Sequence, residues 1–202
     1  MSCSTSSSAR SHWRIVHKRL AEVIAYIDAS RVRLLESVAH VHPSFAEIRP
    51  RDGTWSVAEI LTHLALVDAG VAKLVARSVL WGEEKGVGPE TSDESILSSV
   101  DKFAIVERAA FTAPQNVLPP HDSRMDEALR SLADSRRALR DAFFEGDGMD
   151  LSAIKRPHPA FGELNLYQWG LFIGKHEERH TRQIERTLRD LRESAAESAP
   201  IF

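Results

Sequence analysis

Hydrophobic residues recur every three to four positions over four long stretches of the chain, a spacing typical of amphipathic helices. These stretches cover residues 11–40, 56–80, 122–144 and 165–193. A weaker pattern over residues 93–110 predicts a shorter helix, and Pro- and Gly-rich connections separate the segments. Neither strict alternation nor clustered β-branched residues indicate a sheet. The pattern therefore predicts an all-α protein, an antiparallel four-helix bundle with an extra short helix between helices two and three.

Local signals place several helix ends. Ser56 is followed three residues later by Glu59, which predicts a capping box at the start of the second helix. Asn165 and Gln168 form a weaker version of the same signal before the last helix. Gly82 is expected to end the second helix, because glycine is a poor helix former.

Composition limits the domain organisation and the classes of function. A chain of 202 residues with 43% hydrophobic content is expected to form one domain, over residues 12–193, between a disordered serine-rich tail (1–11) and a frayed C-terminal tail (194–202). The single cysteine, Cys3, has no disulfide partner, and neither a secretory signal nor a membrane span is apparent, so a cytoplasmic protein is expected. Lysine and arginine (26) nearly balance aspartate and glutamate (29), which argues against nucleic acid as a partner. No apolar run is long enough to span a membrane, so no membrane partner is expected.

Two histidines on the last predicted helix carry the strongest chemical signal. His176 and His180 are four residues apart, so both rings lie on one face and can reach one ion. Ile173 and Ile184 share this face, which points it toward the core. Four arginines are expected on the opposite, solvated face: Arg179, Arg182, Arg186 and Arg189.

A third histidine, His63, is flanked by Ile60 and Val67 on the inward side of the second helix. Three imidazoles with an open fourth position match a catalytic zinc site. Nickel, iron and manganese also accept nitrogen ligands. Spacing alone leaves a second interpretation open, in which each histidine is a core residue satisfied by a hydrogen bond.

Other polar residues near these histidines are weaker candidates. Glu59 lies one turn before His63 and could orient its ring, although the capping role explains Glu59 equally well. Glu177 and Gln183 flank the histidine pair and could shuttle protons or contact substrate, with solvated or structural roles as the alternatives. His158, before a proline in a predicted loop, could close over the pocket, and a plain loop histidine without such a role is the favoured alternative.

Two segments resemble signatures of the DinB/YfiT-like superfamily. Residues 54–64, TWSVAEILTHL, are similar to the signature that opens the second helix of that family. The run from His158-Pro159 through Gln168-Trp169 to Gln183-Ile184 resembles its second signature. The resemblance covers residues 12–191. It implies an up-down-down-up bundle with one divalent metal ion on His63, His176 and His180.

The resemblance also implies a class of chemistry. Some members of the family look like S-transferases or isomerases that use a low-molecular-weight thiol, and others resemble hydrolases that use a metal-bound water. We expect a metal-activated nucleophile and a small-molecule substrate, with thiol transfer first, hydrolysis second and a non-catalytic, stress-associated metal-binding module third. Zinc or nickel is expected before iron or manganese, and a small thiol is an optional further cofactor. A homodimer is compatible with these patterns. Arginines that face solvent would not supply a site for the carboxylate of the thiol.

Overall fold

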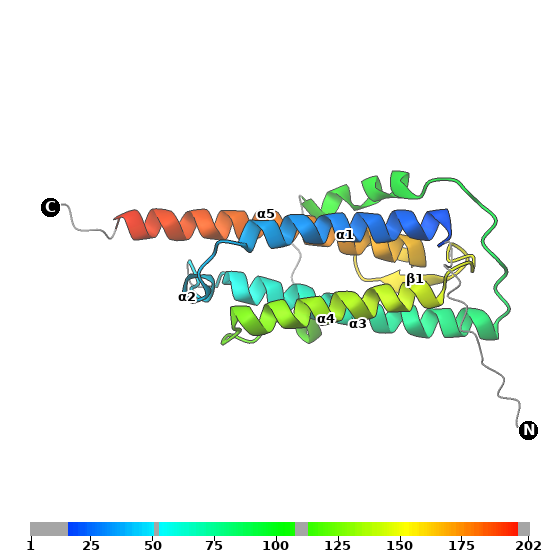
Figure 1. Cartoon of the computed structure of the whole chain (residues 1–202), viewed down its shortest axis with the longest axis horizontal. Helices are drawn as coiled ribbons and strands as arrows, with labels where there is room; N and C mark the ends of the chain where they lie inside the picture. Colours follow the sequence, from blue (N-terminus) through cyan, green and yellow to red (C-terminus); the bar gives the residue numbers. More distant parts are fainter. Residues whose placement is uncertain (1–15, 51–52, 108–112, 198–202) are drawn as a thin grey trace, which may run out of the picture.

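Four long helices form the bundle that the hydrophobic pattern predicts. The computed structural model describes residues 16–50, 53–107 and 113–197. The long helices are α1 (Lys18–Val38), α3 (Val57–Glu84), α4 (Met125–Glu145) and α5 (Leu166–Glu197). Figure 1 shows α1 and α5 running in one direction and α3 and α4 in the other, which confirms the up-down-down-up topology. Among the described helices, none combines the length and the apolar character needed to cross a bilayer.

The connections between the long helices contain several short elements. Helix α2 (Pro43–Ala46) follows α1, and the segment between α3 and α4 holds the 3-10 helices η1 (Leu97–Glu107) and η2 (Gln115–Val117). The extra helix predicted over 93–110 is therefore of the 3-10 type; η1 packs against α5, and residues 108–110 lie outside the described ranges. Because α3 and α4 are parallel and packed side by side, this connection has to return along the whole bundle.

The segment before α5 forms a β-hairpin instead of the loop that we predicted. Strands β1 (Lys155–His158) and β2 (Gly162–Asn165) pair antiparallel, with His158 opposite Gly162. Gly162 has φ +68°, a backbone conformation that suits glycine at this turn. Strands of four residues are too short to show a convincing alternation in the sequence.

The helix ends agree with the prediction in part. Both capping boxes form: Ser56 and Glu59 exchange hydrogen bonds, as do Asn165 and Gln168. Helix α3 continues past Gly82 to Glu84, so the predicted stop was wrong. A Cβ atom at Gly82 would lie 2.7 Å from Ile154 Cδ1, so this glycine permits a close contact rather than ending the helix.

Other boundaries shift by a few residues. Helix α1 begins at Lys18 instead of residue 11, α4 begins at Met125 instead of 122 or 123, and α5 ends at Glu197 instead of 193. The predicted serine-rich tail with Cys3, and residues 198–202 of the predicted C-terminal tail, lie outside the described residues.

The core consists of two apolar clusters with a charged layer between them. One cluster contains Leu20, Ile27 and Phe143, and the other contains Leu34, Leu61 and Ile184. Between them, each long helix contributes one buried charged side chain. We call this set the polar layer: Arg31 of α1, Asp68 of α3, Arg136 of α4 and Glu177 of α5.

Helices α1 and α5 approach closely at glycine, which gives a first prediction. A Cβ atom at Gly170 would lie 2.3 Å from Cγ1 of the fully buried Val23. Gly170→Ala is therefore expected to lower the free energy of unfolding by about 1–3 kcal/mol through overpacking. In the matched control, Gly70→Ala on α3, the new Cβ meets nothing within 4 Å, and a gain of about 0.5–1 kcal/mol is expected. Urea denaturation measures both; equal effects would contradict the close approach.

Candidate metal centre

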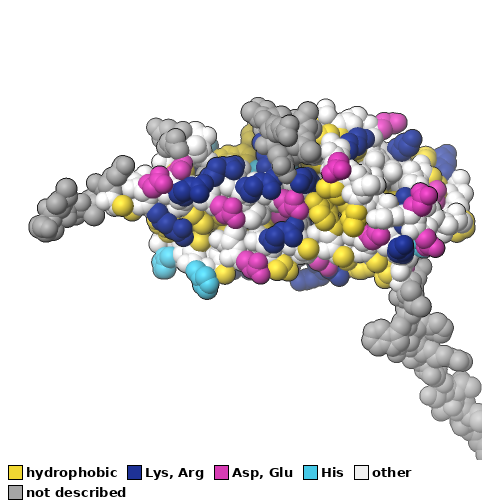
Figure 2. All heavy atoms as spheres, turned by 90° about the horizontal axis from the view of Figure 1, so that it is seen from above, with side chains coloured by type: hydrophobic (Ala, Val, Ile, Leu, Met, Phe, Trp, Pro, Cys, Tyr) yellow, Lys and Arg dark blue, Asp and Glu magenta, His cyan; other side chains and the backbone are white. Residues whose placement is uncertain are grey.

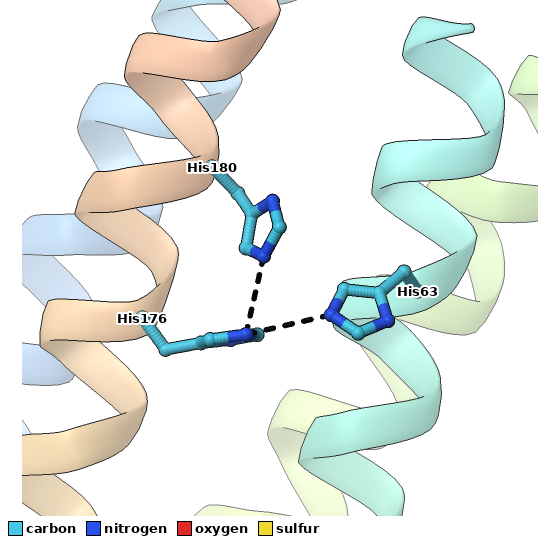
Figure 3. A group of neighbouring side chains, drawn as sticks. All are labelled: His63, His176 and His180. Carbon is cyan, nitrogen blue, oxygen red and sulfur yellow. Dashed lines mark hydrogen bonds between the residues drawn. The ribbon is translucent and has the colours of Figure 1, made fainter. Parts of the chain in front are cut away.

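The structure brings together the three histidines expected to bind metal. His63 extends from α3, and His176 and His180 extend toward it from α5 (Figure 3). Nε2 of His176 lies 3.4 Å from Nε2 of His63 and 3.1 Å from Nε2 of His180. One ring nitrogen from each residue lies within 4.8 Å of the others. Among the described residues, this group contains three histidines and no carboxylate.

Two helices hold the rings in place. One turn of α5 separates His176 from His180, so their rings lie on the same face. His63 is in the second turn of α3, soon after the capping box that fixes where this helix starts. The His63 and His180 side chains are buried, while His176 is partly exposed. The site therefore lies between α3 and α5, near the surface of the bundle.

Hydrogen bonds to the outer ring nitrogens fix the tautomers of two histidines. His63 Nδ1 lies 2.8 Å from the carbonyl oxygen of Val117, which can only accept, so Nδ1 carries the proton. His180 Nδ1 lies 2.7 Å from Gln183 Oε1 and donates in the same way. In the neutral rings the lone pair is then on Nε2, the nitrogen that faces the other histidines.

The nitrogen positions fit one divalent ion. Zinc binds histidine nitrogen at about 2.0–2.1 Å, which places tetrahedral ligands about 3.4 Å apart. The separations of 3.4 and 3.1 Å from His176 Nε2 agree with such an arrangement, and the third pair of nitrogens lies within 4.8 Å. Three uncharged imidazoles leave the charge of the ion uncompensated, and the donor set accepts zinc, nickel, iron or manganese.

The environment keeps all three rings neutral. Burial lowers the pKa of His63, and the nearby Arg179 lowers it further, against the hydrogen bond to Val117. Burial, followed by the charges of His180 and His63, holds the pKa of His176 well below 6.5. Burial, with a contribution from His63, lowers the pKa of His180 to about 3. Protons therefore compete weakly with a metal ion at neutral pH.

Arg179 lies closer to the site than the sequence indicated. We expected it on the solvated face of the last helix, but its side chain is half-buried and its charge lowers the pKa of all three histidines. Arg186 also lowers the pKa of His180. The signal that was missed is spacing, because Arg179 follows His176 by three residues and neighbours it on the helix surface.

The three further candidates have different surroundings. Gln183 accepts a hydrogen bond from His180, as expected of a residue that orients a metal ligand. The Glu59 carboxylate accepts from Ser56 N and pairs with Arg49, and its capping role explains these contacts. The Glu177 side chain is buried in the polar layer, bound to arginines of α1 and α4. The Val117 carbonyl was missed, because any residue type can supply a backbone oxygen.

His158 belongs to an aromatic group beside the histidines. Its ring centroid lies 4.5 Å from that of Phe172, which in turn lies 5.4 Å from His176. Burial lowers the pKa of His158 to about 4, so its ring is neutral at pH 7. The hairpin β1–β2 thus places His158 next to the site, where the sequence suggested only a loop that could close over a pocket.

The bond between Gln183 and His180 gives a second prediction. Gln183→Leu removes the acceptor for the Nδ1 proton, and we expect zinc affinity to fall about 10–100-fold because the ring loses its fixed orientation. Gln183→Glu retains an acceptor oxygen, so its zinc affinity should stay within a few-fold of the wild-type value. Chelator competition measures both constants. Equal affinities for the leucine and glutamate variants would show that the bond does not orient the ring.

Comparisons with known proteins agree with this fold. A family model described as the DinB superfamily matches residues 26–184, a range that contains all three histidines. The chain is 29% identical over 138 residues to the uncharacterized protein YuaE of Bacillus subtilis (strain 168), covering 68% of this chain and 79% of that protein. It is also similar to the crystal structure of TT2238, a four-helix bundle protein, with a TM-score of 0.56, 21% identity, and coverage of 83% of this chain and 98% of that one. The structural similarity shows the fold, and the family match over most of the sequence shows that the chain belongs to the DinB superfamily.

Proposed function

We propose that the protein is a metal-dependent enzyme that acts on a small molecule. His63, His176 and His180 would hold one divalent ion, and the observation that carries this proposal is the convergence of their Nε2 atoms. A bound ion supplies Lewis-acid chemistry, which makes a thiol or a water molecule nucleophilic near neutral pH. The absence of a carboxylate from this group of described residues favours a reactive centre over a closed structural site.

Transfer of a low-molecular-weight thiol is the first reaction that we propose. In this reaction the thiol loses its proton to solvent, its sulfur forms a bond to an electrophilic carbon, and the leaving group departs with the electron pair of the broken bond. Arg179, beside the histidines, and Arg186 place positive charge where the carboxylate of such a thiol could bind. Arg179 is half-buried, whereas Arg182, Arg186 and Arg189 are exposed, so Arg179 is the arginine of this helix that best supports the proposal.

Hydrolysis is the second candidate. Three neutral histidines are also the donor set of a zinc centre that activates water. In that reaction, water adds to the electrophilic centre and loses a proton, the bond to the leaving group breaks and the leaving group departs with its electron pair, and no thiol is required. A non-catalytic metal-binding module is the third candidate, for which we expect full metal loading without turnover.

The charges on one face of the molecule argue against nucleic acid as the partner. On the face drawn in Figure 2, Lys and Arg side chains are interspersed with Asp and Glu side chains. Sequence-independent binding of nucleic acid requires a field of one sign that neutralises phosphates. The mixed charges of this face do not form such a field, which argues against nucleic acid binding there.

A panel of electrophiles and activated esters, with and without small thiols, tests the proposed reaction. We expect metal-loaded protein to form the thiol conjugate, and Arg179→Ala to raise the KM for the thiol about 5–20-fold with unchanged metal content. Arg189→Ala, an exposed arginine on the same helix, is the matched control. Turnover of esters at the same rate without thiol would favour hydrolysis. Complete metal loading with no turnover in either arm would favour the non-catalytic module.

A further inference from the structure

The polar layer lies in the interior of the bundle at the level of the metal centre. Its four charged residues are all buried, with side chains no more than 10% exposed. Glu177 is adjacent to the metal-ligand candidate His176 in α5, and Asp68 follows His63 by five residues in α3. The two helices that carry the histidines therefore each carry one carboxylate of the layer.

Glu177 anchors α5 to both α1 and α4. Its Oε1 accepts a hydrogen bond of 2.6 Å from Arg31 Nε, and its Oε2 accepts one of 3.1 Å from Arg136. The Ser30 hydroxyl of α1 lies 2.5 Å from the same Oε2 atom. Both carboxylate oxygens of Glu177 are thus satisfied by groups on two other helices.

Asp68 and the arginines complete the layer. Asp68 Oδ2 accepts from Arg31 at 2.9 Å and from Arg136 at 3.0 Å, which anchors α3 to the same two helices. Each guanidinium also donates to a backbone carbonyl of the other's helix: Arg31 to Leu132 of α4, and Arg136 to Ile27 of α1. Two positive and two negative side chains balance, so the layer is electrically neutral and its hydrogen bonds link all four helices.

Such a layer defines the rotation and the axial position of each helix. Apolar side chains can slide past one another at small cost, whereas a shift that breaks a buried charged hydrogen bond leaves a charge without a partner. Consecutive residues of an α-helix point about 100° apart. When Glu177 is fixed toward α1 and α4, His176 is therefore directed to another side of α5, the side that faces α3.

We infer that the polar layer positions the metal ligands. Arg31 and Arg136 act as positioning residues, because they hold Glu177 and Asp68 and thereby align α5 with α3, so that three imidazole nitrogens meet at one point. This inference rests on the proposed metal site. It also predicts that stability and metal affinity can be separated, because a buried ion cluster is weak evidence of stability and its replacement by packed apolar residues is often neutral or stabilising.

The test replaces the whole layer with apolar residues: Arg31→Met, Asp68→Leu, Arg136→Met and Glu177→Leu in one chain. We expect a melting temperature at or above that of the unchanged protein, together with zinc affinity at least about tenfold lower. The visible spectrum of the cobalt-substituted protein should also change, because it reports the ligand geometry. Leu20→Ala, in the apolar cluster on the other side of the layer, is the control that lowers stability while zinc affinity stays within about twofold.

Three outcomes decide the inference. A folded fourfold variant with unchanged zinc affinity and cobalt spectrum would overturn it and leave the metal site standing. If the fourfold variant does not fold, Glu177→Gln, which keeps the shape and removes the charge, is measured in the same way with the same criteria. If the wild-type protein bound neither zinc nor cobalt, this result would overturn the inference together with the proposed function.

Discussion

Replacing His176 with alanine is expected to weaken zinc binding at least about 100-fold and to abolish metal-dependent turnover. The His176 Nε2 atom lies within 3.4 Å of the Nε2 atoms of both His63 and His180. Its loss leaves only two ligands, which come from different helices. The side chain is also partly exposed, and its removal creates a smaller cavity than removal of a fully buried residue would. The affinity loss should therefore come without unfolding, as chelator competition and a melting curve on the same sample will show.

His40→Ala provides the control for this variant. His40 is an exposed histidine in the turn after α1, two residues past Val38, and it lies outside the group of three. We expect its replacement to leave zinc affinity unchanged. If His176→Ala retained the affinity of the His40 variant, the three nitrogens would not form the binding site.

Acid is expected to destabilise the metal-free protein strongly. In the folded state burial lowers the pKa of His180 from 6.5 to about 3, and the pKa values of His63 and His176 are lowered as well. The unfolded chain binds these protons near pH 6.5 and the folded chain does not, so stability is lost as the pH falls below about 6.5. Each of these histidines contributes up to about 1.4 kcal/mol per pH unit to the slope of the unfolding free energy against pH, and the three together contribute about 2–4 kcal/mol per unit.

Urea denaturation in the presence of a chelator, from pH 7.5 to 5, measures this slope. His180→Gln removes one titrating group, and we expect the slope to decrease by about 1.4 kcal/mol per pH unit. Identical slopes for the glutamine variant and the unchanged protein would contradict the lowered pKa of His180.

Periodicity predicted the four long helices because each has a wide apolar face, and these faces were enough to predict a helical bundle. It placed His176 and His180 on one side of α5, since a separation of four residues is a property of a single helix. It could not show that His63 meets them, because contact between helices depends on the topology. The family resemblance supplied this missing link.

The residues that the sequence did not reveal are those whose role depends on a partner from another helix. Arg31 follows Ile27 by four residues and precedes Leu34 by three, so it shares their buried stripe, yet a single charge there does not name its partners. Glu177 was considered beside the metal ligands because it is next to His176, while in the structure its contacts are with Arg31 and Arg136. Consecutive residues of a helix point in different directions, and only the packing of the helices shows which partner each side chain contacts.

Metal analysis of purified protein tests the central claim most directly. The unchanged protein, stripped with a chelator and reloaded with zinc, is predicted to retain about one ion per chain after desalting. The variant with His63→Ala and His176→Ala together is predicted to retain almost none, while its circular dichroism still shows the helical bundle. Stoichiometric zinc in the folded double variant would contradict the assignment of His63, His176 and His180 as the metal centre.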